Sequence, residues 1–532
     1  MIGKTDSIDY FSKNLLIISI IKKIIMTKRH IFILLYIIAA SLCLSYSTDA
    51  QSISSQDIVQ TIRKEAEILA ADPAFSQASV GICVRNADGS DIASVNAGKM
   101  LIPASNMKLI TTGAALEHFG PQRKFKTTIA YDGTISDGIL KGNLYIIGGG
   151  DPTLGSKDSI ASPLERTFSQ WYKALTNTGI KEIEGRIIGD GRWFDGPAEE
   201  QSWLWEDLGT YYGTGTCGLM FYENMMSFTV SARQFVGEPV IIRPYYPQTQ
   251  WMDIRYKCST GEKGTGDKLY MFTSDIAPVA EIRGTFGIDK GKKRVDCSNK
   301  FPEYTCAKYF ADFLAQRGID CYGGAADCKL KNDWLESHTS SPLTVIAETF
   351  SPELSRIIFE TNHISNNVFA ETLLRQLGKD INASADYPQS IDALEDVLGK
   401  ELGLDLSRGI YIKDGSGLSR GNLVSPDFLC RFLQAMMHTE DFEEFLHGLP
   451  KPGGHGSLYF NMRKYADSVK DRIRLKSGSM NGVRCYSGYI IPASGCIEDS
   501  IIISVMVNNC TTPNWKILPL IDSFLAKVAA SH

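Results

Sequence analysis

The chain has 532 residues, of which 43% are hydrophobic and 22% are charged. This is the composition of a folded globular protein, and the length is too great for one ordinary core, so two or three domains are expected. The formal net charge of −5 excludes a surface-wide site for polyanions, and no nucleic acid partner is expected.

The N-terminal segment has the order of a cleavable export signal. Met26 is followed by a basic Thr-Lys-Arg-His stretch, an apolar run at 31–44, and small and polar residues up to Ala50. This order predicts a signal peptide over residues 26–50, with Met26 as the true start and a periplasmic mature protein. A retained membrane anchor is the alternative, although the apolar run is shorter than the roughly 20 residues that span a bilayer.

Twelve cysteines are present. Cys321 with Cys328, and Cys258 with Cys297, are candidate disulfide pairs, but spacing alone does not define connectivity. No Cys-x-x-Cys or His-x-x-x-His pattern has the spacing of metal ligands. The sequence therefore predicts neither a structural metal nor a cofactor.

The elements expected along the chain begin with a helix at 56–72, a hairpin at 79–84 and 92–95, and a helix that Pro103 opens. Short β-like runs with glycine turns fill the middle. The later elements are helices at 351–378, 389–401 and 426–447, strands at 472–475, 485–491 and 501–508, and a closing helix at 513–529. This order predicts one α/β domain formed by residues 56–126 and 346–530, interrupted by β-rich inserted domain(s) at 127–345.

Ser105 and Lys108 lie three residues apart at the start of the helix expected after Pro103. This spacing places them on one helical face, where a hydroxyl and an amine can meet. A neutral lysine can take the proton of a serine, and a helix N-terminus favours the negative charge on the attacking oxygen. Ser-x-x-Lys occurs by chance about twice in a chain of this length, so the pair needs support from other motifs.

Two further motifs provide that support. Lys476-Ser477-Gly478 directly follows the strand expected at 472–475, where it can bind a carboxylate-bearing peptide beside the strand. The Lys476 ammonium is also expected to lower the pKa of Lys108. Ser365-Asn366-Asn367 precedes an amphipathic run. A catalytic role is one interpretation of Ser365 and Asn367, and the alternative is that they form the N-cap of the following helix.

The three motifs, in this order, resemble the set found in penicillin-binding proteins and class A β-lactamases. Further stretches carry the resemblance from about residue 80 to residue 510: they are PASNMKL at 103–109, GGGDPTL at 148–154, DGSGLSR at 414–420, Gly456-Ser457-Leu458 with Arg463, and KSGS at 476–479. The chain resembles low-molecular-mass penicillin-binding proteins of the D-Ala-D-Ala carboxypeptidase/endopeptidase family with a large inserted region. The family more often has Thr where this chain has Ser477.

The resemblance implies a penicillin-recognising transpeptidase/β-lactamase-like fold, an antiparallel sheet flanked by helices. It implies that Ser105 attacks the carbonyl between two terminal D-alanines with Lys108 as base, and that Ser365 relays the proton to the leaving amine. The expected partners are peptidoglycan stem peptides and β-lactam antibiotics.

The resemblance also implies a binding role for the remaining motif residues. Asn367 would hold the substrate amide and Lys108, and the backbone N–H groups of Ser105 and Ser479 would form the oxyanion hole. Lys476 and Ser477 would anchor the terminal carboxylate, next to Gly478.

Two other functions remain as alternatives. A β-lactamase would share the serine–lysine chemistry, with Tyr222-x-Asn224 as a candidate tyrosine motif, but more than two hundred inserted residues do not suit that class and no deacylating glutamate is evident. A non-catalytic cell-wall-binding protein would not need Ser105, Lys108 and Lys476. His363 is interpreted as structural and Asp414 as a turn residue that supports the site.

Overall fold

The computed structural model describes residues 55–157, 160–327 and 342–532. The predicted signal peptide at 26–50 and Cys328 lie outside these residues. Contacts group the chain into two compact units, Met1–Ile58 and Val59–His532. Within the described ranges, no helix is long and apolar enough to cross a membrane.

The two ends of the second unit meet in one five-stranded antiparallel sheet. Its strand order is β19-β20-β21-β1-β2, and β1 pairs with β21 from Ser79↔Asn508 to Arg85↔Ile502. The strands are β1 (Ser79–Arg85), β2 (Asp91–Val95), β19 (Ile473–Met480), β20 (Val483–Ile490) and β21 (Ile501–Asn508). The hairpin predicted near residue 80 is confirmed. The inserted region lies in the chain between β2 and β19.

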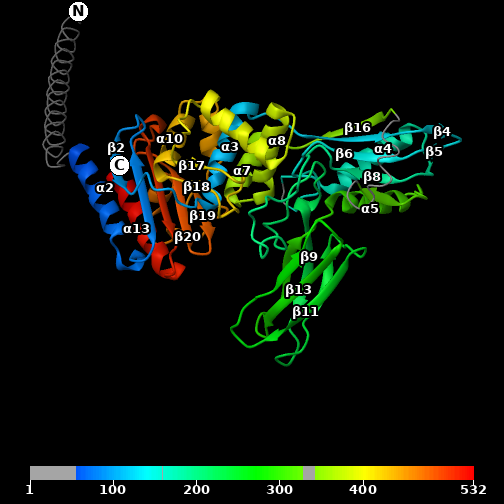
Figure 1. Ribbon diagram of the computed structural model, residues 1–532, viewed down its shortest axis with the longest axis horizontal. Helices are drawn as coiled ribbons and strands as arrows, with labels where there is room; N and C mark the ends of the chain where they lie inside the picture. The colour runs from blue at the N-terminus through cyan, green and yellow to red at the C-terminus, as the bar shows by residue number, and fades with distance from the viewer. Residues whose placement is uncertain (1–54, 158–159, 328–341) are drawn as a thin grey trace, which may run out of the picture. The chain divides into compact units, whose positions relative to one another are not determined.

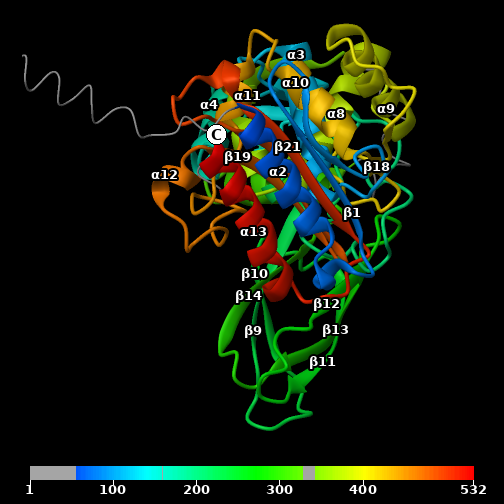
Figure 2. The same cartoon turned by 90° about the vertical axis from the view of Figure 1, so that its left-hand side faces the viewer.

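Helices cover both faces of this sheet (Figures 1 and 2). On one face α2 (Ser55–Ala70) and α13 (Asn514–Ser531) lie side by side, joined by an ion pair of 2.7 Å between Glu65 and Lys527. The helices on the other face are α3 (Met107–Phe119), α7 (Leu354–His363), α8 (Asn367–Asn382), α9 (Tyr387–Asp396), α10 (Pro426–Met436) and α11 (Phe442–His447). The predicted arrangement, an antiparallel sheet flanked by helices, is confirmed.

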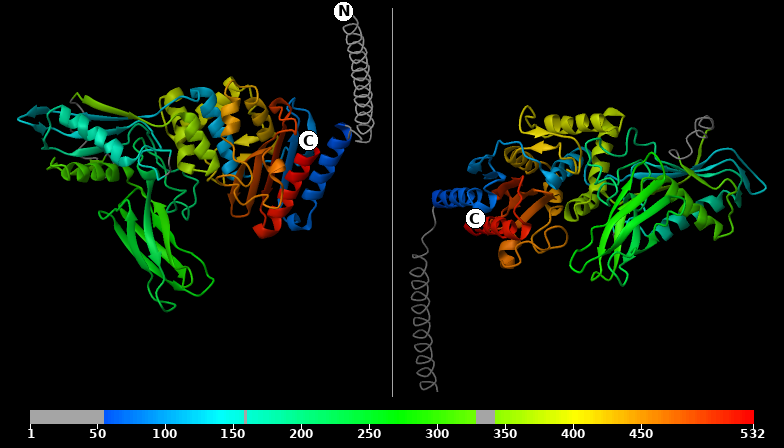
Figure 3. Two further views of the ribbon diagram at one scale, coloured as in Figure 1. Left: turned by 180° about the vertical axis from the view of Figure 1, so that it is seen from behind. Right: turned by 60° about the horizontal axis from the view of Figure 1, so that its bottom comes forward.

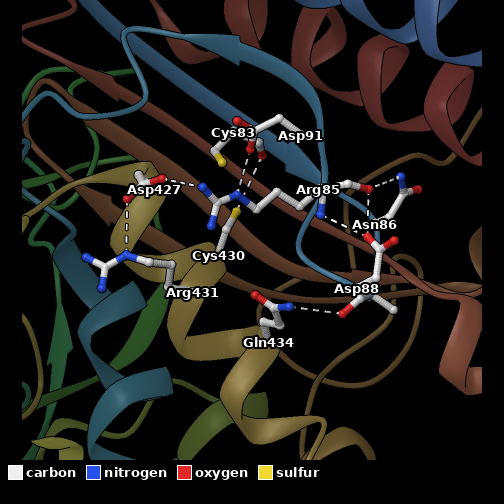
Figure 4. Close-up of polar contacts among 11 residues, drawn as sticks. Cys83, Arg85, Asn86, Asp88, Asp91, Asp427, Cys430, Arg431 and Gln434 are labelled. Atoms are coloured by element: carbon white, nitrogen blue, oxygen red, sulfur yellow. Dashed lines mark hydrogen bonds and ion pairs between the residues drawn. The ribbon is translucent and has the colours of Figure 1, made fainter. Parts of the chain in front are cut away.

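Polar contacts fix α10 to the sheet (Figure 4). The guanidinium of Arg85 on β1 forms ion pairs with Asp427 at 2.6 Å and with Asp91 at 2.9 Å. Asp427 also pairs with Arg431 one turn along the helix, at 3.2 Å. Because Arg85 is half-buried, these pairs lose less to solvent screening than exposed ones do, and they hold the helix in register with the strand.

Four predicted elements differ in their bounds or are divided in two. Pro103 precedes a 3-10 turn, Ala104–Asn106, and α3 begins only at Met107. The helix predicted at 351–378 is two helices, and so is the one predicted at 426–447. β19 continues to Met480, so Lys476-Ser477-Gly478 lies inside the strand rather than after it.

The middle of the chain folds around two further cores (Figures 1 and 3). The first surrounds a five-stranded sheet of order β15-β8-β6-β3-β16 with two helices, α4 (Leu164–Asn177) and α5 (Pro302–Ala315). Its strands are β3 (Lys126–Tyr131), β6 (Leu144–Gly148), β8 (Ile187–Asp190), β15 (Ala325–Asp327) and β16 (Thr344–Phe350). A small sheet of order β4-β5-β7 adjoins it, with β4 (Thr134–Ser136), β5 (Ile139–Lys141) and β7 (Glu182–Ile183).

The second of these cores lies between two three-stranded sheets, coloured green in Figure 3. One has the order β10-β9-β14, with β9 (Met225–Ser231), β10 (Ile241–Tyr246) and β14 (Lys292–Ser298). The other has the order β11-β13-β12, with β11 (Asp253–Gly261), β12 (Tyr270–Thr273) and β13 (Val279–Gly287). Cys258 and Cys297 both lie in this core as free thiols, so the disulfide suggested for them is not formed in this structure.

Candidate active site

A cavity of about 720 Å³ brings the three sequence motifs together. The motif residues that line it are Ser105, Ser365, Asn367, Ser477 and Ser479. Lys108 and Lys476 are buried beneath its floor and reach it with their amines, because Lys108 Nζ contacts Ser105 and Lys476 Nζ contacts Ser365. The site thus brings together residues that lie up to 371 positions apart in sequence, from 105 to 476.

The amine of Lys108 donates three hydrogen bonds inside this site. Its acceptors are Ser105 Oγ at 3.0 Å, Asn367 Oδ1 at 2.6 Å and the Ser416 carbonyl at 2.7 Å. The side chain is fully buried in the first turn of α3, whose residues from Met107 to Leu116 are all buried. A base held within hydrogen-bond reach of a hydroxyl is the geometry that activates a serine nucleophile.

Burial lowers the pKa of Lys108 to about 7, while the charges of Glu371 and Asp414 act in the opposite direction. The sequence prediction named partial burial and the Lys476 charge together, and burial is the cause that lowers this pKa here. The pKa of Lys476 is itself well below its ordinary value, first because of burial and then because of the Lys108 charge. With its pKa near 7, Lys108 is a base available near neutral pH.

Ser365 occupies the break between α7 and α8. Its backbone is in the left-handed region, with φ +59°, which L-residues rarely adopt, and its Oγ accepts a hydrogen bond of 3.0 Å from Lys476 Nζ. The N-cap of α8 is Asn366, whose Oδ1 accepts from the Phe369 N–H. The N-cap alternative for Ser365 and Asn367 is thus wrong, since the residue between them does the capping.

Asn367 is held from both ends of its amide. Its Oδ1 accepts from Lys108 Nζ, and its Nδ2 donates to the Tyr212 carbonyl at 2.9 Å. These two bonds define which end of the amide faces the lysine, because only the oxygen can accept. Tyr212 belongs to the inserted region, so the insertion orients a residue of the site.

The edge strand β19 forms another wall. Ser477 Oγ lies 3.1 Å from Ser457 Oγ, at the mouth of the cavity. A Cβ on Gly478 would lie 2.4 Å from the Pro103 carbonyl oxygen, so only glycine allows β19 to approach the turn that carries Ser105 this closely. A free strand edge with a hydroxyl and a nearby lysine can bind an extended peptide that ends in a carboxylate.

The turn that follows β17 (Ile410–Tyr411) supports Lys108 from below. Asp414 is fully buried and accepts from four donors, the N–H groups of Gly417 and Ser419, Asn422 Nδ2 and Trp203 Nε1. Glu371, one turn after Asn367 on α8, accepts from the N–H groups of Gly415 and Ser416. Burial, followed by the charge of Asp414, raises the pKa of Glu371 to about 8. The Ser416 carbonyl that accepts from Lys108 is therefore rigidly placed.

The inserted region supplies one side of the cavity, which the sequence motifs did not reveal. The lining residues from it are Leu204, Glu206, Asp207, Tyr211 and Tyr212, and Arg420 lines the same cavity. Ser202 Oγ lies 2.5 Å from Ser419 Oγ, and Trp203 bonds to Asp414, so this segment is attached to the DGSGLSR turn. No periodicity or motif in residues 202–212 pointed to the site.

Other residues considered from sequence lie elsewhere. Tyr222 is in the core of the inserted region and accepts a hydrogen bond from Arg294, and Asn224 donates to the Gly215 carbonyl, so neither lines the cavity. His363 is buried against Phe359, and burial lowers its pKa to about 4, which keeps the ring neutral. In the described ranges, no group of three or more His, Cys, Asp or Glu could hold a metal ion.

A serine hydroxyl beside a buried amine with a pKa of about 7, next to a strand edge that can hold a peptide, defines a serine acyl-transfer site. A sequence profile of the D-Ala-D-Ala carboxypeptidase 3 (S13) family matches residues 62–525. The chain belongs to this family. The prediction of a serine-type D-Ala-D-Ala carboxypeptidase/endopeptidase of the low-molecular-mass penicillin-binding class is thereby confirmed.

Individual proteins agree with this assignment. The D-alanyl-D-alanine carboxypeptidase of Actinomadura sp. (strain R39) is 27% identical over 453 residues, which cover 83% of this chain and 80% of that protein. The penicillin-sensitive carboxypeptidase A of Dictyostelium discoideum is 26% identical over 460 residues, with 83% and 84% covered. The crystal structure of penicillin binding protein 4 (dacB) from Haemophilus influenzae has the same fold, with a TM-score of 0.74, 20% identity, and coverage of 87% of this chain and 98% of that one.

Proposed function

We propose that Ser105 carries the covalent step of a D-Ala-D-Ala carboxypeptidase that acts on peptidoglycan stem peptides. Ser105 Oγ bonds to the carbonyl carbon between the two D-alanines, and its proton passes to Lys108. The bond to the terminal D-alanine then breaks, and the proton that Lys108 took is relayed through the Ser365 hydroxyl to the departing amine. Water releases the acyl group and restores the Ser105 hydroxyl.

The observation that carries this proposal is the hydrogen bond between Lys108 Nζ and Ser105 Oγ, at 3.0 Å. A serine hydroxyl ionises far above neutral pH, so it needs a base at this distance, and a lysine with a pKa of about 7 is half unprotonated at neutral pH. The backbone N–H groups of Ser105 and Ser479 face the developing oxyanion in this scheme, which is the arrangement that stabilises tetrahedral intermediates.

The charges around the cavity suit a stem peptide. Lys476 and Ser477 on β19 are placed to receive the terminal carboxylate, and the close contact at Gly478 lets the peptide lie along the strand. Asp207 and Arg420 line other parts of the same cavity with opposite charge. Such a pair matches a peptide side chain that ends in both an ammonium and a carboxylate group.

β-Lactams are proposed to acylate the same serine. The Haemophilus influenzae protein that shares this fold has been solved in complex with a β-lactam. A reactive amide that reaches Ser105 would meet the same nucleophile and base as the stem peptide does.

The test compares wild-type protein, Ser105→Ala and Ser468→Ala, the last as a matched control on an exposed serine of the short helix α12 (Asp467–Lys470). D-alanine release from a pentapeptide and labelling by a fluorescent penicillin are measured on each. Ser105→Ala is expected to lose both, with D-alanine release falling on the order of 10³-fold or more, and Ser468→Ala to keep both. Covalent labelling of Ser105→Ala would mean that another residue is the nucleophile.

Export to the periplasm is proposed on two grounds. Residues 26–50 have the order of a signal peptide, and the stem peptides of peptidoglycan lie outside the cytoplasm. N-terminal sequencing of the protein from its native host should find a mature chain that begins near Gln51. A cytoplasmic protein with Met26 intact would contradict the proposal.

A further inference from the structure

Three aromatic side chains form a partly exposed surface beside the cavity, here called the aromatic platform: Trp205, Tyr270 and Phe272. The Trp205 ring stacks on the Phe272 ring with centroids 5.9 Å apart, and Tyr270 meets Phe272 edge to face at 5.1 Å. Trp205 is 60% exposed and Tyr270 44% exposed. A cluster of exposed aromatic rings is a feature of binding surfaces.

The aromatic platform is held in place from below. The guanidinium of Arg283 on β13 lies 4.9 Å from the centre of the Phe272 ring. A Cβ on Gly209 would lie 1.6 Å from the Met271 carbonyl oxygen, so the loop that carries Trp205 is in direct contact with the backbone of β12. The Ser298 N–H also donates to the Gly209 carbonyl at 3.0 Å. Trp205 therefore rests on a fixed support, as a preformed binding surface requires.

The aromatic platform is continuous with the active site. Leu204 and Glu206, the two neighbours of Trp205 in sequence, both line the cavity that contains Ser105. Trp203, one residue further back, bonds to Asp414 beneath the same cavity. Trp205 itself does not line the cavity, so a ligand has to extend past Leu204 and Glu206 to reach its ring.

We propose that the aromatic platform binds the glycan strand of polymeric peptidoglycan while the stem peptide of that strand lies in the cavity. The inference rests on the proposed function, because it takes the stem peptide as the substrate. An extended stem of three or four residues spans about 10–14 Å, so the sugars to which it is attached must pass close to the rim of the cavity.

The chemistry of the aromatic platform fits sugar rings. A pyranose presents a face of C–H groups that packs against the flat face of an indole or phenol ring, while its hydroxyl and amide groups stay in contact with water and polar neighbours. Glu206 supplies a carboxylate beside Trp205 that can accept from such groups. An exposed, supported tryptophan next to an acidic rim suits an uncharged, hydroxyl-rich polymer better than it suits a lipid surface.

The first experiment compares two substrates of the same chemistry. D-alanine release is measured from a soluble pentapeptide and from insoluble peptidoglycan sacculi, with wild-type protein, Trp205→Ala and the double variant Trp205→Ala/Tyr270→Ala. Trp515→Ala is the matched control, because Trp515 is 72% exposed but lies on α13. We expect the platform variants to lose about three- to tenfold on sacculi and to stay within about twofold on the pentapeptide. Equal rates on sacculi, or an equal loss on both substrates, would overturn the proposal.

The second experiment does not depend on catalysis. Glycan strands freed of their peptides are tested for binding to Ser105→Ala protein, with and without the double platform substitution, alongside size measurement by light scattering. Binding that is lost only with the platform substitution supports the proposal. Unchanged binding, or a platform variant that changes oligomeric state instead, would overturn it. If wild-type protein cleaves neither substrate while the glycan strands still bind, the proposed function fails and the glycan site stands.

Discussion

The amine of Lys108 and the amide oxygen of Asn367 lie 2.6 Å apart, although 259 residues separate them in sequence. The Oδ1 atom of Asn367 can only accept a hydrogen bond, and its Nδ2 atom donates to the Tyr212 carbonyl. The lysine is thus hydrogen-bonded to neutral oxygen atoms, at Ser105, Asn367 and Ser416, and to no carboxylate. Such partners let burial keep its pKa near 7, which a carboxylate at the same place would prevent.

The first prediction concerns this pKa. In wild-type protein, kcat/KM for a pentapeptide should rise with pH and level off above about 7, as the Lys108 amine loses its proton. Asn367→Asp places a carboxylate at hydrogen-bond distance from Nζ, which favours the ammonium form and raises its pKa. The midpoint of the profile should therefore shift to higher pH, whatever the loss in maximal rate. Asn514→Asp, at the exposed start of α13, should leave the midpoint unchanged.

The second prediction concerns the close contact at Gly478. Gly478→Ala would place a methyl group 2.4 Å from the Pro103 carbonyl oxygen, closer than any real Cβ contact, so β19 must move away from the turn that carries Ser105. Penicillin labelling should slow by at least about tenfold, because a displacement of about 1 Å in a catalytic group can cost 100-fold in rate. Gly98→Ala is the control, since nothing lies within 4 Å of its added methyl group. Equal labelling rates for the two variants would show that β19 does not need to approach this closely.

Much of the site could be predicted from the sequence because its motifs are local and chemically distinctive. Ser105 and Lys108 are three residues apart on one helical turn, and Lys476-Ser477-Gly478 is the only Lys-[Ser/Thr]-Gly in the chain. The strands β1 and β21 were also predictable, because both are apolar runs of ordinary strand length, but their pairing has no local signal.

Other features had no local signal. The helical pattern of 351–378 continues across the break at Ser365, because a serine in the left-handed region looks like any other serine in sequence. β19 was predicted to end at residue 475, since the polar and glycine residues up to Met480 do not read as a strand. The cavity wall from residues 204–212 is attached to the site by long-range contacts such as the bond between Trp203 and Asp414, and these leave no periodicity in the sequence.

The third prediction concerns stability. Asp414→Ala would leave the buried donors of Gly417, Ser419, Asn422 and Trp203 without their acceptor. The free energy of unfolding should fall by about 2–5 kcal/mol, as measured by urea denaturation. Asp88→Ala, in the exposed turn of the first hairpin, should cost less than about 1 kcal/mol. A loss below that level for Asp414→Ala would mean that the turn re-forms its bonds without the carboxylate.

The last prediction separates the two causes that have been considered for the low pKa of Lys108. Burial is the leading cause of the low pKa of Lys108, and the Lys476 charge is not among its causes, so removal of the Lys476 amine should not move the titration of Lys108. Lys476→Met, which keeps the volume and removes the amine, should therefore leave the midpoint of the kcat/KM profile near 7. The same variant should lose more activity on peptides with a free terminal carboxylate than on the matching amides, because a bound carboxylate favours the charged form of Lys476 and pairs with it in the wild-type protein. Lys476→Arg is the companion variant, since it restores a charge and should recover part of the preference for the carboxylate. A midpoint that rises by a unit or more in Lys476→Met would show that the second amine, rather than burial, sets the pKa of the base.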